Sequence, residues 1–515
     1  MRVTGTGHAG LFVETAAGSV LCDPWVSPAY FASWFPFPDN SQLDWDRFGN
    51  ADYLYVSHLH KDHFDPATLR RHVSTKATVL LPAYRTNELE DALHDLGFRS
   101  FVQPPSGEPV DVDGLRVMIV ALTSPTDGPI GDSALALDDG ERRLLNLNDA
   151  RPGDLEGMRE FGPYDAFALQ FSGAIWYPMV YDLPERAKQA LGKQKRERQL
   201  DRALRYIDSV DARYVLPTAG PPCFLDDDLR QWNDTDNDDA NIFPDQTVFL
   251  DYLASKGRDN GRLLLPGTVA TLTADDCEIE HPVPDDEVKR IFADKASYLA
   301  AYAERRRREI DADRASWPVP GVDILAELKA WWEPLLEEAD RICAGVGGPV
   351  RFEVGDDLVL VIDFLAREVR EYADERCRYW FRVARPLVER LVADREKDWV
   401  NSLFLSMRFT TGRIGPYNEY LYTFFKCLSD ERINYAEGWY ADESGVEEEV
   451  TLGDWQVQRR CPHLKADLTR FGVIEGGVLT CQMHGWRFDL ASGRCLTAEG
   501  YPLRSRPAVE ANSAG

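Results

Sequence analysis

Two groups of cysteine and histidine residues have a spacing that suits metal binding. Toward the C-terminal end, Cys461 and His463 form a C-x-H pair, and Cys481 and His484 form a C-x-x-H pair. A 2Fe-2S cluster whose two irons have different ligands needs two thiolates and two imidazoles, as these pairs offer. Nearer the N-terminus, the run 58–63 (HLHKDH) holds three of the nine histidines. This density predicts a second metal site rather than a polar loop with histidines clustered by chance.

The C-terminal pattern is that of a Rieske cluster, and zinc is the competing occupant because two Cys and two His are also a zinc set. Zinc fingers usually pair Cys with Cys and His with His, whereas each motif here supplies one of each. Gly476 and Gly477 predict a hairpin between the two ligand loops. The stretch from His484 (HGWRFDLASG) is similar to the tail of oxygenase-type Rieske domains. Ala466 and Met483 stand where high-potential Rieske proteins carry a disulfide, which favours a low-potential donor.

The N-terminal run follows an apolar β stretch directly, so four side chains on one turn can converge on a metal. H-x-H-x-D-H is the signature of the metallo-β-lactamase fold, which predicts an αββα sandwich. Asp149 follows a strand, as a bridging aspartate of that fold does. Asp127 is our candidate carboxylate in the segment where the fold carries another histidine. His8 either supports a metal ligand, faces the substrate or is a core histidine.

A dinuclear zinc hydrolase of this fold needs more histidines than the chain offers. Three imidazoles with carboxylates favour a single non-haem ferrous ion with positions open to O2. Its tentative ligands are His58, His60, Asp62, His63, Asp127 and Asp149, with His58, His60, His63 and Asp149 as the catalytic set. Only 31 residues follow His484, and they hold no H-x-x-x-x-H iron motif. The one credible destination for the cluster's electrons within this chain is therefore the 58–63 site.

Length and composition limit the remaining possibilities. With 515 residues we expect a metallo-β-lactamase-like domain over 1–275, a helix-rich α/β middle domain over 276–440 and an all-β Rieske domain over 441–515. The net charge of −28 argues against binding to nucleic acid or to anionic membranes. No apolar run is long enough for a membrane span, and the N-terminus has no apolar signal segment. Nine scattered cysteines show no disulfide framework, so we expect a cytoplasmic protein.

Beyond these motifs, the chain resembles the CMP-N-acetylneuraminate hydroxylase family, which combines the two domains, and in particular its bacterial branch, the UDP-N-acetylmuramate hydroxylases. The resemblance runs along most of the chain, through the segments 22–25 (CDPW), 30–42 (YFASWFPFPDNSQ), 58–65 (HLHKDHFD), 128–133 (GPIGDS), 148–152 (NDARP), 172–182 (SGAIWYPMVYD), 219–226 (AGPPCFLD), 417–427 (YNEYLYTFFKC) and 459–468 (RRCPHLKADL).

The resemblance implies an O2-dependent monooxygenase that converts the N-acetyl group of UDP-N-acetylmuramate, a peptidoglycan precursor of the cell wall, to N-glycolyl. It also implies a non-haem iron and an external NAD(P)H-dependent reductase or ferredoxin. The cluster and the iron must lie within electron-tunnelling distance of each other. Assembly into a homo-oligomer is one way to bring them that close. Two alternatives stay open. One is a metal-dependent hydrolase whose Rieske domain senses redox state, and the other is an electron-transfer protein with a degenerate first domain.

An anionic nucleotide sugar would need local positive charge in so acidic a protein. Arg151 follows Asp149 by two residues and is a candidate for binding a carboxylate, with a structural ion pair equally favoured. The helix expected over 188–205 is a second candidate, although a solvated helix face is the preferred interpretation; its cations include Lys193, Lys195, Arg196, Arg198 and Arg202. Trp176 and Tyr177 either line the substrate pocket or fill the core, and core filling is preferred.

Overall fold

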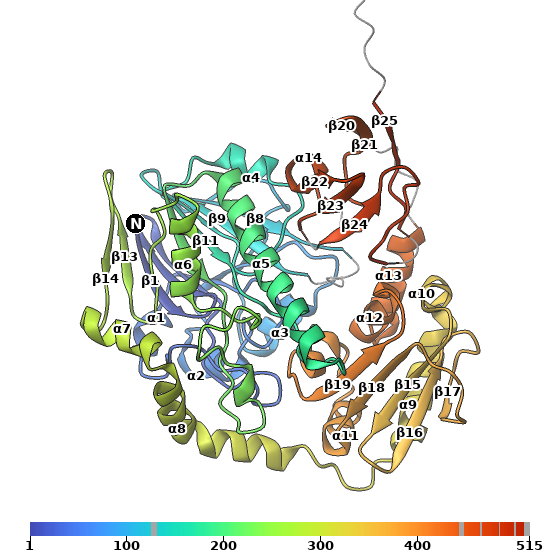
Figure 1. Cartoon of the computed structure of the whole chain (residues 1–515). Coiled ribbons are helices and arrows are strands. Elements are labelled where there is room, and N and C mark those ends of the chain that lie inside the picture. The colour runs from blue at the N-terminus through green and yellow to red at the C-terminus, as the bar shows by residue number, and fades with distance from the viewer. Residues whose placement is uncertain (125–130, 442–447, 464–465, 484, 499–500, 509–515) are drawn as a thin grey trace, which may run out of the picture.

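A computed structural model gives the arrangement of the chain in three parts, a sandwich (residues 1–280), a middle domain (residues 285–441) and a Rieske domain (residues 448–508), as Figure 1 shows. The structure describes residues 1–124, 131–441, 448–463, 466–483, 485–498 and 501–508. Among these residues, no helix combines the length and apolar character needed to cross a bilayer.

The first sheet of the sandwich has eight strands. Their order is β14 (Cys277–Glu280), β13 (Val269–Leu272), β1 (Arg2–Gly7), β2 (Gly10–Thr15), β3 (Gly18–Cys22), β4 (Tyr53–Tyr55), β5 (Thr78–Leu80) and β6 (Phe101–Val102). Side chains alternate between its faces, so that Leu11 and Val13 face the second sheet while Phe12 faces the outer helices. The sandwich extends past residue 275, because β14 pairs with β13 in a hairpin and forms the edge strand of this sheet.

The second sheet has six strands and packs face to face on the first. Their order is β12 (Tyr214–Thr218), β11 (Ala166–Gln170), β10 (Arg143–Asn146), β9 (Ser133–Asp138), β8 (Leu115–Ala121) and β7 (Val110–Val112). The core between the sheets is almost entirely aliphatic, with Val13 and Val20 meeting Leu135 and Leu137. This dry layer fixes the register of both sheets, because a slip by one residue would turn each apolar set outward.

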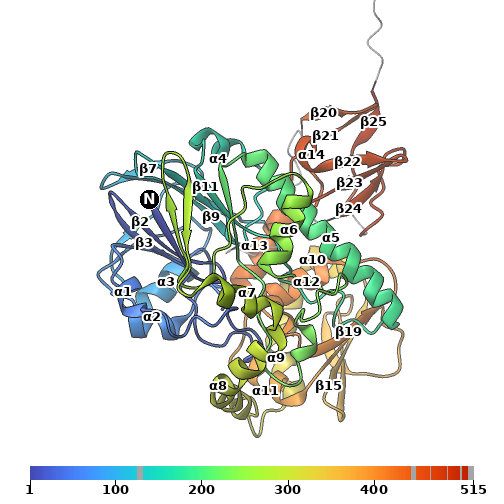
Figure 2. The ribbon, with the colours of Figure 1, turned by 60° about the vertical axis from the view of Figure 1, so that its left-hand side comes forward.

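Helices cover both outer faces of the sandwich. On the first sheet lie α1 (Trp45–Phe48), α2 (Pro66–His72) and α3 (Glu88–Asp95), and on the second lie α4 (Glu156–Phe161), α5 (Glu185–Val210) and α6 (Gln246–Ser255). The four layers are the predicted αββα arrangement, and the metallo-β-lactamase-like fold is confirmed. Figure 2 shows α5 passing beside the Rieske domain.

The middle domain is reached through α7 (Asp285–Ala293) and α8 (Lys295–Ser316). It holds a five-stranded sheet in the order β17 (Glu368–Glu371), β16 (Leu358–Asp363), β15 (Pro349–Val354), β18 (Tyr379–Val383) and β19 (Phe409–Arg413). Its helices are α9 (Ile324–Glu338), α10 (Asp340–Val346), α11 (Arg385–Ala393), α12 (Glu419–Lys426) and α13 (Asp430–Ala441). Its core is rich in aromatic residues, with Trp332 packed edge-on against Trp399.

The Rieske domain consists of two three-stranded sheets. One contains β20 (Glu449–Leu452), β21 (Trp455–Gln458) and β25 (Ser505–Pro507), and the other contains β22 (Gly472–Glu475), β23 (Val478–Cys481) and β24 (Trp486–Asp489), with α14 (Leu468–Phe471) beside them. The predicted hairpin joins β22 to β23, and its residues Gly476 and Gly477 have φ of 55° and 78°. The apolar core of this domain is continuous with the outer face of the six-stranded sheet and with α5.

Candidate metal centre and cluster site

Segments that are distant in sequence bring metal-binding side chains to one end of the sandwich. Residues 58–63 form the loop that follows β4, and Asp149 follows β10. Asp132 directly precedes β9, and His8 lies in the turn between β1 and β2. His8 has a φ of 53°, in the left-handed region that few residues other than glycine adopt. This turn directs the buried His8 ring into the cluster.

The ligand atoms fall into two groups, and within each group they all lie within 4.8 Å of one another. The first group consists of His58, His60, Asp132 and Asp149, and the second of His8, Asp62 and His63. In the first group, His58 Nε2 lies 2.7 Å from His60 Nδ1 and 3.5 Å from Asp132 Oδ1. The sequence predicted one ion, whereas the described residues offer two ligand sets with two imidazoles each.

Asp149, a member of the first group, also faces the second group. Its Oδ1 is 4.0 Å from His58 Nε2, and its Oδ2 is 3.5 Å from His63 Nε2. In the second group, Asp62 Oδ2 is 2.9 Å from His8 Nε2 and 3.7 Å from His63 Nε2. A carboxylate that turns one oxygen toward each group has the geometry of a ligand shared by two metal ions.

Buried polar residues contact the Nδ1 atoms of the ligand histidines His58 and His63. Asp23 Oδ2 lies 3.0 Å from His63 Nδ1. Ser57 Oγ lies 2.9 Å from His58 Nδ1 and 3.1 Å from His63 Nδ1, and it donates to Asp23 at 2.8 Å. Contacts of this kind fix the ring orientation and direct Nε2 of each ring toward a metal.

The donors fit a cationic metal. His63 Nε2 and Asp149 Oδ1 are buried and make no hydrogen bond among the described residues, which is costly for polar atoms unless another ligand binds them. Burial and the neighbouring His63 lower the pKa of His58 to about 4, and burial also lowers the pKa of His60. Both rings are therefore neutral at pH 7, the form that coordinates metal. Burial opposes ionisation of Asp149, but His63 and His58 outweigh it and lower the pKa of this carboxyl.

Three of the four predicted cluster ligands, Cys461, His463 and Cys481, lie in the described part of the Rieske domain. Cys461 follows β21 and Cys481 ends β23; both are buried and neither forms a disulfide. Burial and the hydrogen-bonded Cys481 raise the pKa of Cys461. No cation compensates these two adjacent thiols in the described structure. They fit a site whose thiols lose their protons when iron binds. His484, the fourth predicted ligand, lies outside the described residues.

His463 connects the cluster site to the middle domain. Its ring stacks on Trp486, with 3.8 Å between the ring centroids. Its Nε2 lies 2.5 Å from Oε2 of the buried Glu419 in α12. A carboxylate behind the outer nitrogen of a cluster imidazole orients the ring. The middle domain therefore holds one of the predicted ligands in place.

One short segment joins the metal centre to the Rieske domain. It begins at Asp149, which faces both ligand groups. Four residues later, the carbonyl oxygen of Gly153 accepts a hydrogen bond from the Asp467 backbone N–H at 3.0 Å. Asp154 forms an ion pair at 2.7 Å with Arg460, the residue before the first cluster cysteine. Because four residues span at most about 14 Å, the two sites lie close together within one chain.

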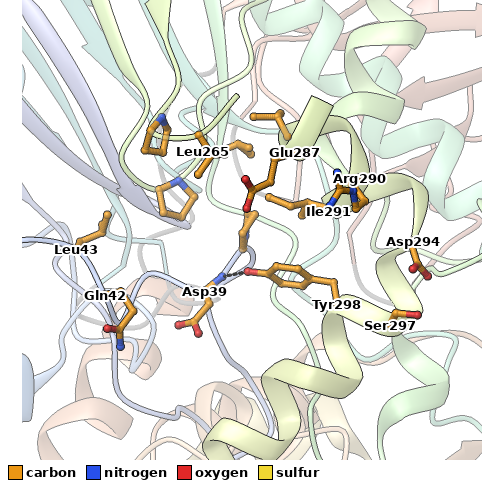
Figure 3. A pocket seen from close by; sticks show the side chains of 15 residues that line it. Asp39, Gln42, Leu43, Leu265, Glu287, Arg290, Ile291, Asp294, Ser297 and Tyr298 are labelled. Carbon is orange, nitrogen blue, oxygen red and sulfur yellow. Dashed lines mark hydrogen bonds between the residues drawn. The ribbon is translucent and has the colours of Figure 1, made fainter. Parts of the chain in front are cut away.

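A surface cavity of about 470 Å³ opens beside the metal centre. His60 and Lys61 line it from the sandwich, and Asp398 and Arg432 line it from the middle domain. A second cavity, of about 570 Å³, is lined by residues 38–43 and by α7 and α8. Figure 3 shows this second cavity, which contains none of the metal-ligand side chains. The smaller cavity is therefore the better candidate for access to the metal centre.

The two aromatic candidates for the substrate pocket differ in their surroundings. Trp176 is buried, with its ring centroid 5.3 Å from that of Phe404 and 5.8 Å from that of Tyr422. Its position is that of a core residue, the preferred interpretation of the sequence. Tyr177 is half-buried, with the Arg413 guanidinium 5.4 Å from its ring centre.

The remaining candidate residues are divided between described and undescribed segments. Asp127 lies outside the described residues. Arg151 donates to Gln170 at 2.5 Å rather than to a carboxylate. Sequence reasoning missed Asp132, whose only signal was a second carboxylate in the segment that supplied Asp127. It also missed Tyr30, which donates to Asp62 from within the resembling segment 30–42.

Two segments of the chain match known protein families. Residues 453–505 match the Rieske [2Fe-2S] domain, and residues 324–442 match an SCP2-like domain described as Rv3818-like. The chain is 54% identical over 514 residues to the Rieske 2Fe-2S iron-sulfur protein Rv3818 of Mycobacterium tuberculosis, covering 98% of this chain and 99% of the relative. It is 53% identical over 516 residues to the Rieske 2Fe-2S iron-sulfur protein of Mycolicibacterium smegmatis, with the same coverage.

More distant similarity concerns parts of the chain. It is 28% identical over 236 residues to the cytidine monophosphate-N-acetylneuraminic acid hydroxylase of Pan troglodytes, covering 43% of this chain and 38% of the relative. Among solved structures, CmlA, a diiron β-hydroxylase from Streptomyces venezuelae, matches with a TM-score of 0.35 and 20% identity, over 51% of this chain and 53% of that one.

Proposed function

The chain belongs to the family of Rieske 2Fe-2S iron-sulfur proteins that includes these two mycobacterial relatives, and we propose that it is an O2-dependent monooxygenase. In this proposal the Rieske cluster is the electron donor and the ligand groups around Asp149 hold the non-haem iron that receives the electrons. The observation that carries the proposal is the 149–154 segment. Its first residue lies in the metal centre, and its last two contact the Rieske domain.

This segment supports electron transfer within one chain. Its backbone spans at most about 14 Å between Asp149 and Gly153. The Rieske contact at its far end includes Arg460, which is bonded to a cluster cysteine. A ring of subunits is then unnecessary for bringing the two redox sites together.

The ligand types favour iron over zinc. Each group combines two imidazoles with at least one carboxylate, and two imidazoles with one carboxylate are the set typical of non-haem iron sites that handle O2. When bound there, iron would supply the O2 chemistry that hydroxylation of an unactivated C–H bond requires, which no acid or base side chain can supply. The protein's own contribution is to fix the rings through Asp23 and Ser57, and to keep His58 and His60 neutral by burial.

We propose that the substrate is UDP-N-acetylmuramate, whose N-acetyl group becomes N-glycolyl. Two observations support this class of compound. The chain resembles the UDP-N-acetylmuramate hydroxylases along most of its length, and its partial relatives are named hydroxylases of a nucleotide-linked N-acetylated sugar acid. The electrons would come from an external reductase or ferredoxin.

The direct test is incubation of the reduced, iron-loaded protein with UDP-N-acetylmuramate and O2. We expect a product heavier by one oxygen atom, with the label retained when 18O2 is used. His60→Ala should abolish this product and leave the Rieske spectrum intact, because His60 belongs only to the metal centre. Cys481→Ser should abolish both. Full activity of the His60→Ala protein would contradict the proposal.

A metal-dependent hydrolase is the second candidate, because two ligand groups that share a carboxylate are also the arrangement of dinuclear hydrolases. Metal analysis separates the two functions. Zinc at both groups, with substrate cleavage in the absence of O2, would favour the hydrolase. Iron at these groups, with turnover that needs both O2 and a reductant, would favour the monooxygenase.

A further inference from the structure

Three cations lie on one face of α5. Lys195, Arg198 and Arg202 follow one another at spacings of three and four residues, which places them on the same side of the helix. Two cations elsewhere on this helix are paired, since Lys193 pairs with Asp239 at 2.5 Å on the surface and Arg196 pairs with Asp234 at 2.8 Å. We call the side of Lys193 and Arg196 the paired face of α5, and the side of Lys195, Arg198 and Arg202 its unpaired face.

The unpaired face contacts the Rieske domain at Met483 and at Gly485. Arg202 donates to the carbonyl oxygen of Met483 at 2.9 Å. Gly485 has a φ of 74°, and a Cβ there would lie 2.8 Å from Arg198 Nη1. Arg151, in the segment that starts at Asp149, joins this group from the sandwich, because it is among the cations that lower the pKa of Arg202. We call Arg151, Lys195, Arg198 and Arg202 the junction cations.

No junction cation forms an ion pair with a carboxylate within the described part of the chain; the hydrogen-bond partners of Arg151 and Arg202 are a side-chain amide and a backbone carbonyl. Burial, followed by Arg202, Arg151 and Arg198, lowers the pKa of Lys195 to about 7. The chain has 86 acidic and 58 basic residues, so carboxylates were abundant for pairing. Four basic side chains without a carboxylate partner among the described residues of so acidic a protein point to an external anion, whose charge would also favour the protonated form of Lys195.

We propose that the junction cations bind the diphosphate group of a nucleotide ligand, at the boundary of the sandwich and the Rieske domain. Lys195, Arg198 and Arg151 are half-buried, so a ligand can reach them, while Arg202 is 7% exposed. A diphosphate is the anion that matches several converging donors, whereas one carboxylate would satisfy at most two.

The position of the site fits a ligand whose other end reaches the metal centre. Arg151 lies two residues from Asp149, which turns its carboxylate to both ligand groups. Burial and Arg487 lower the pKa of Arg198, and Tyr177 lies near enough to oppose this shift in part. The Arg413 guanidinium of β19 covers the Tyr177 ring, so the middle domain borders the site. The identification of the ligand as a nucleotide sugar rests on the proposed function, but the anion site itself does not.

Calorimetric titration of the full-length holoprotein with UDP tests the site, without O2 or reductant. Lys195→Gln and Arg198→Gln should each weaken UDP binding about tenfold or more, because each removes a charge-assisted contact. Lys193→Gln, two residues away on the paired face, is the matched control and should change the affinity less than twofold. Lys195→Arg should retain affinity within about threefold. Equal affinity of the wild type, Lys195→Gln and Arg198→Gln would overturn the proposal, as would the absence of saturable UDP binding to the wild type.

Two further probes define what the site recognises. Inorganic pyrophosphate should compete with UDP, and uridine should not; competition by uridine as strong as that by UDP would overturn the assignment to the diphosphate. Failure of this inference is distinguishable from failure of the proposed function. Loss of UDP binding in Lys195→Gln without any hydroxylated product in the wild type would leave the site standing and reject the monooxygenase. Hydroxylation at the wild-type rate and KM by Lys195→Gln would reject the site and leave the monooxygenase standing.

Discussion

Replacement of Asp149 by Asn should empty both ligand groups of the metal centre at once. The carboxylate turns Oδ1 toward His58 at 4.0 Å and Oδ2 toward His63 at 3.5 Å. Alteration of a group that merely supports a metal ligand costs about 10- to 100-fold in affinity. Loss of a shared, charged ligand should cost at least about 100-fold for each ion, or about 2.7 kcal/mol. Asp132→Asn is the matched comparison, because Asp132 belongs to the first group alone.

Anaerobic titration with ferrous iron, followed by gel filtration and iron analysis, measures this difference. With about two irons in the Rieske cluster and one in each ligand group, we expect about four per chain in the wild type. Asp132→Asn should retain about three, and Asp149→Asn about two. The Rieske electron paramagnetic resonance signal should be unchanged in both. If Asp149→Asn retained as much iron as Asp132→Asn, or the wild type bound only about three, Asp149 would not be a shared ligand.

Three further predictions concern residues around these sites. His8→Ala should remove about one iron from the second group and leave the first occupied; an unchanged iron content would show that His8 is no ligand. Asp226→Asn should lower the free energy of unfolding by about 3 kcal/mol in urea titration, because it leaves the buried Arg408 without its carboxylate, 2.7 Å away. Burial opposes ionisation of Asp226, but Arg408 outweighs it and lowers its pKa, so the contribution is present above pH 4 and is lost as the pH falls through the folded-state value; an equally steep acid transition in the variant would contradict this. Tyr206→Phe removes the hydrogen bond from its hydroxyl to the Pro152 carbonyl oxygen at 2.9 Å, and should slow reoxidation of the cluster by O2 in the presence of substrate, measured by stopped-flow absorbance. Reoxidation at the wild-type rate would remove this segment from the electron route.

The local parts of both sites could be predicted from the sequence. Each motif is compact in sequence: the loop 58–63, the C-x-H pair and the C-x-x-H pair. The preceding strand or hairpin fixes where each motif lies. The four-layered fold followed from the same loop together with the alternation of short strands and helices. These features depend on residues that are close together in the sequence, so the sequence alone reveals them.

Two members of the ligand groups, His8 and Asp132, could not be predicted as ligands in this way. His8 and Asp132 reach the centre only because the β1–β2 turn and the start of β9 lie at the same end of two stacked sheets. The unpaired face of α5 was likewise hidden, because the spacing of its cations resembles a solvated helix. Only the folded chain distinguishes Lys193, which pairs with Asp239, from Lys195, which has no carboxylate partner among the described residues.

The apolar core that runs without interruption from the six-stranded sheet through α5 into the Rieske domain has a consequence for how this protein can be altered. Buried contacts such as Tyr206 against Phe471 belong to both domains, so the core of the Rieske domain is not closed without the sandwich. The Rieske domain is therefore not an independent domain on a flexible linker that another Rieske domain could simply replace. A Rieske domain from another protein would have to reproduce this shared packing before its cluster could serve the metal centre, and the distance between the two redox sites is set when the chain folds.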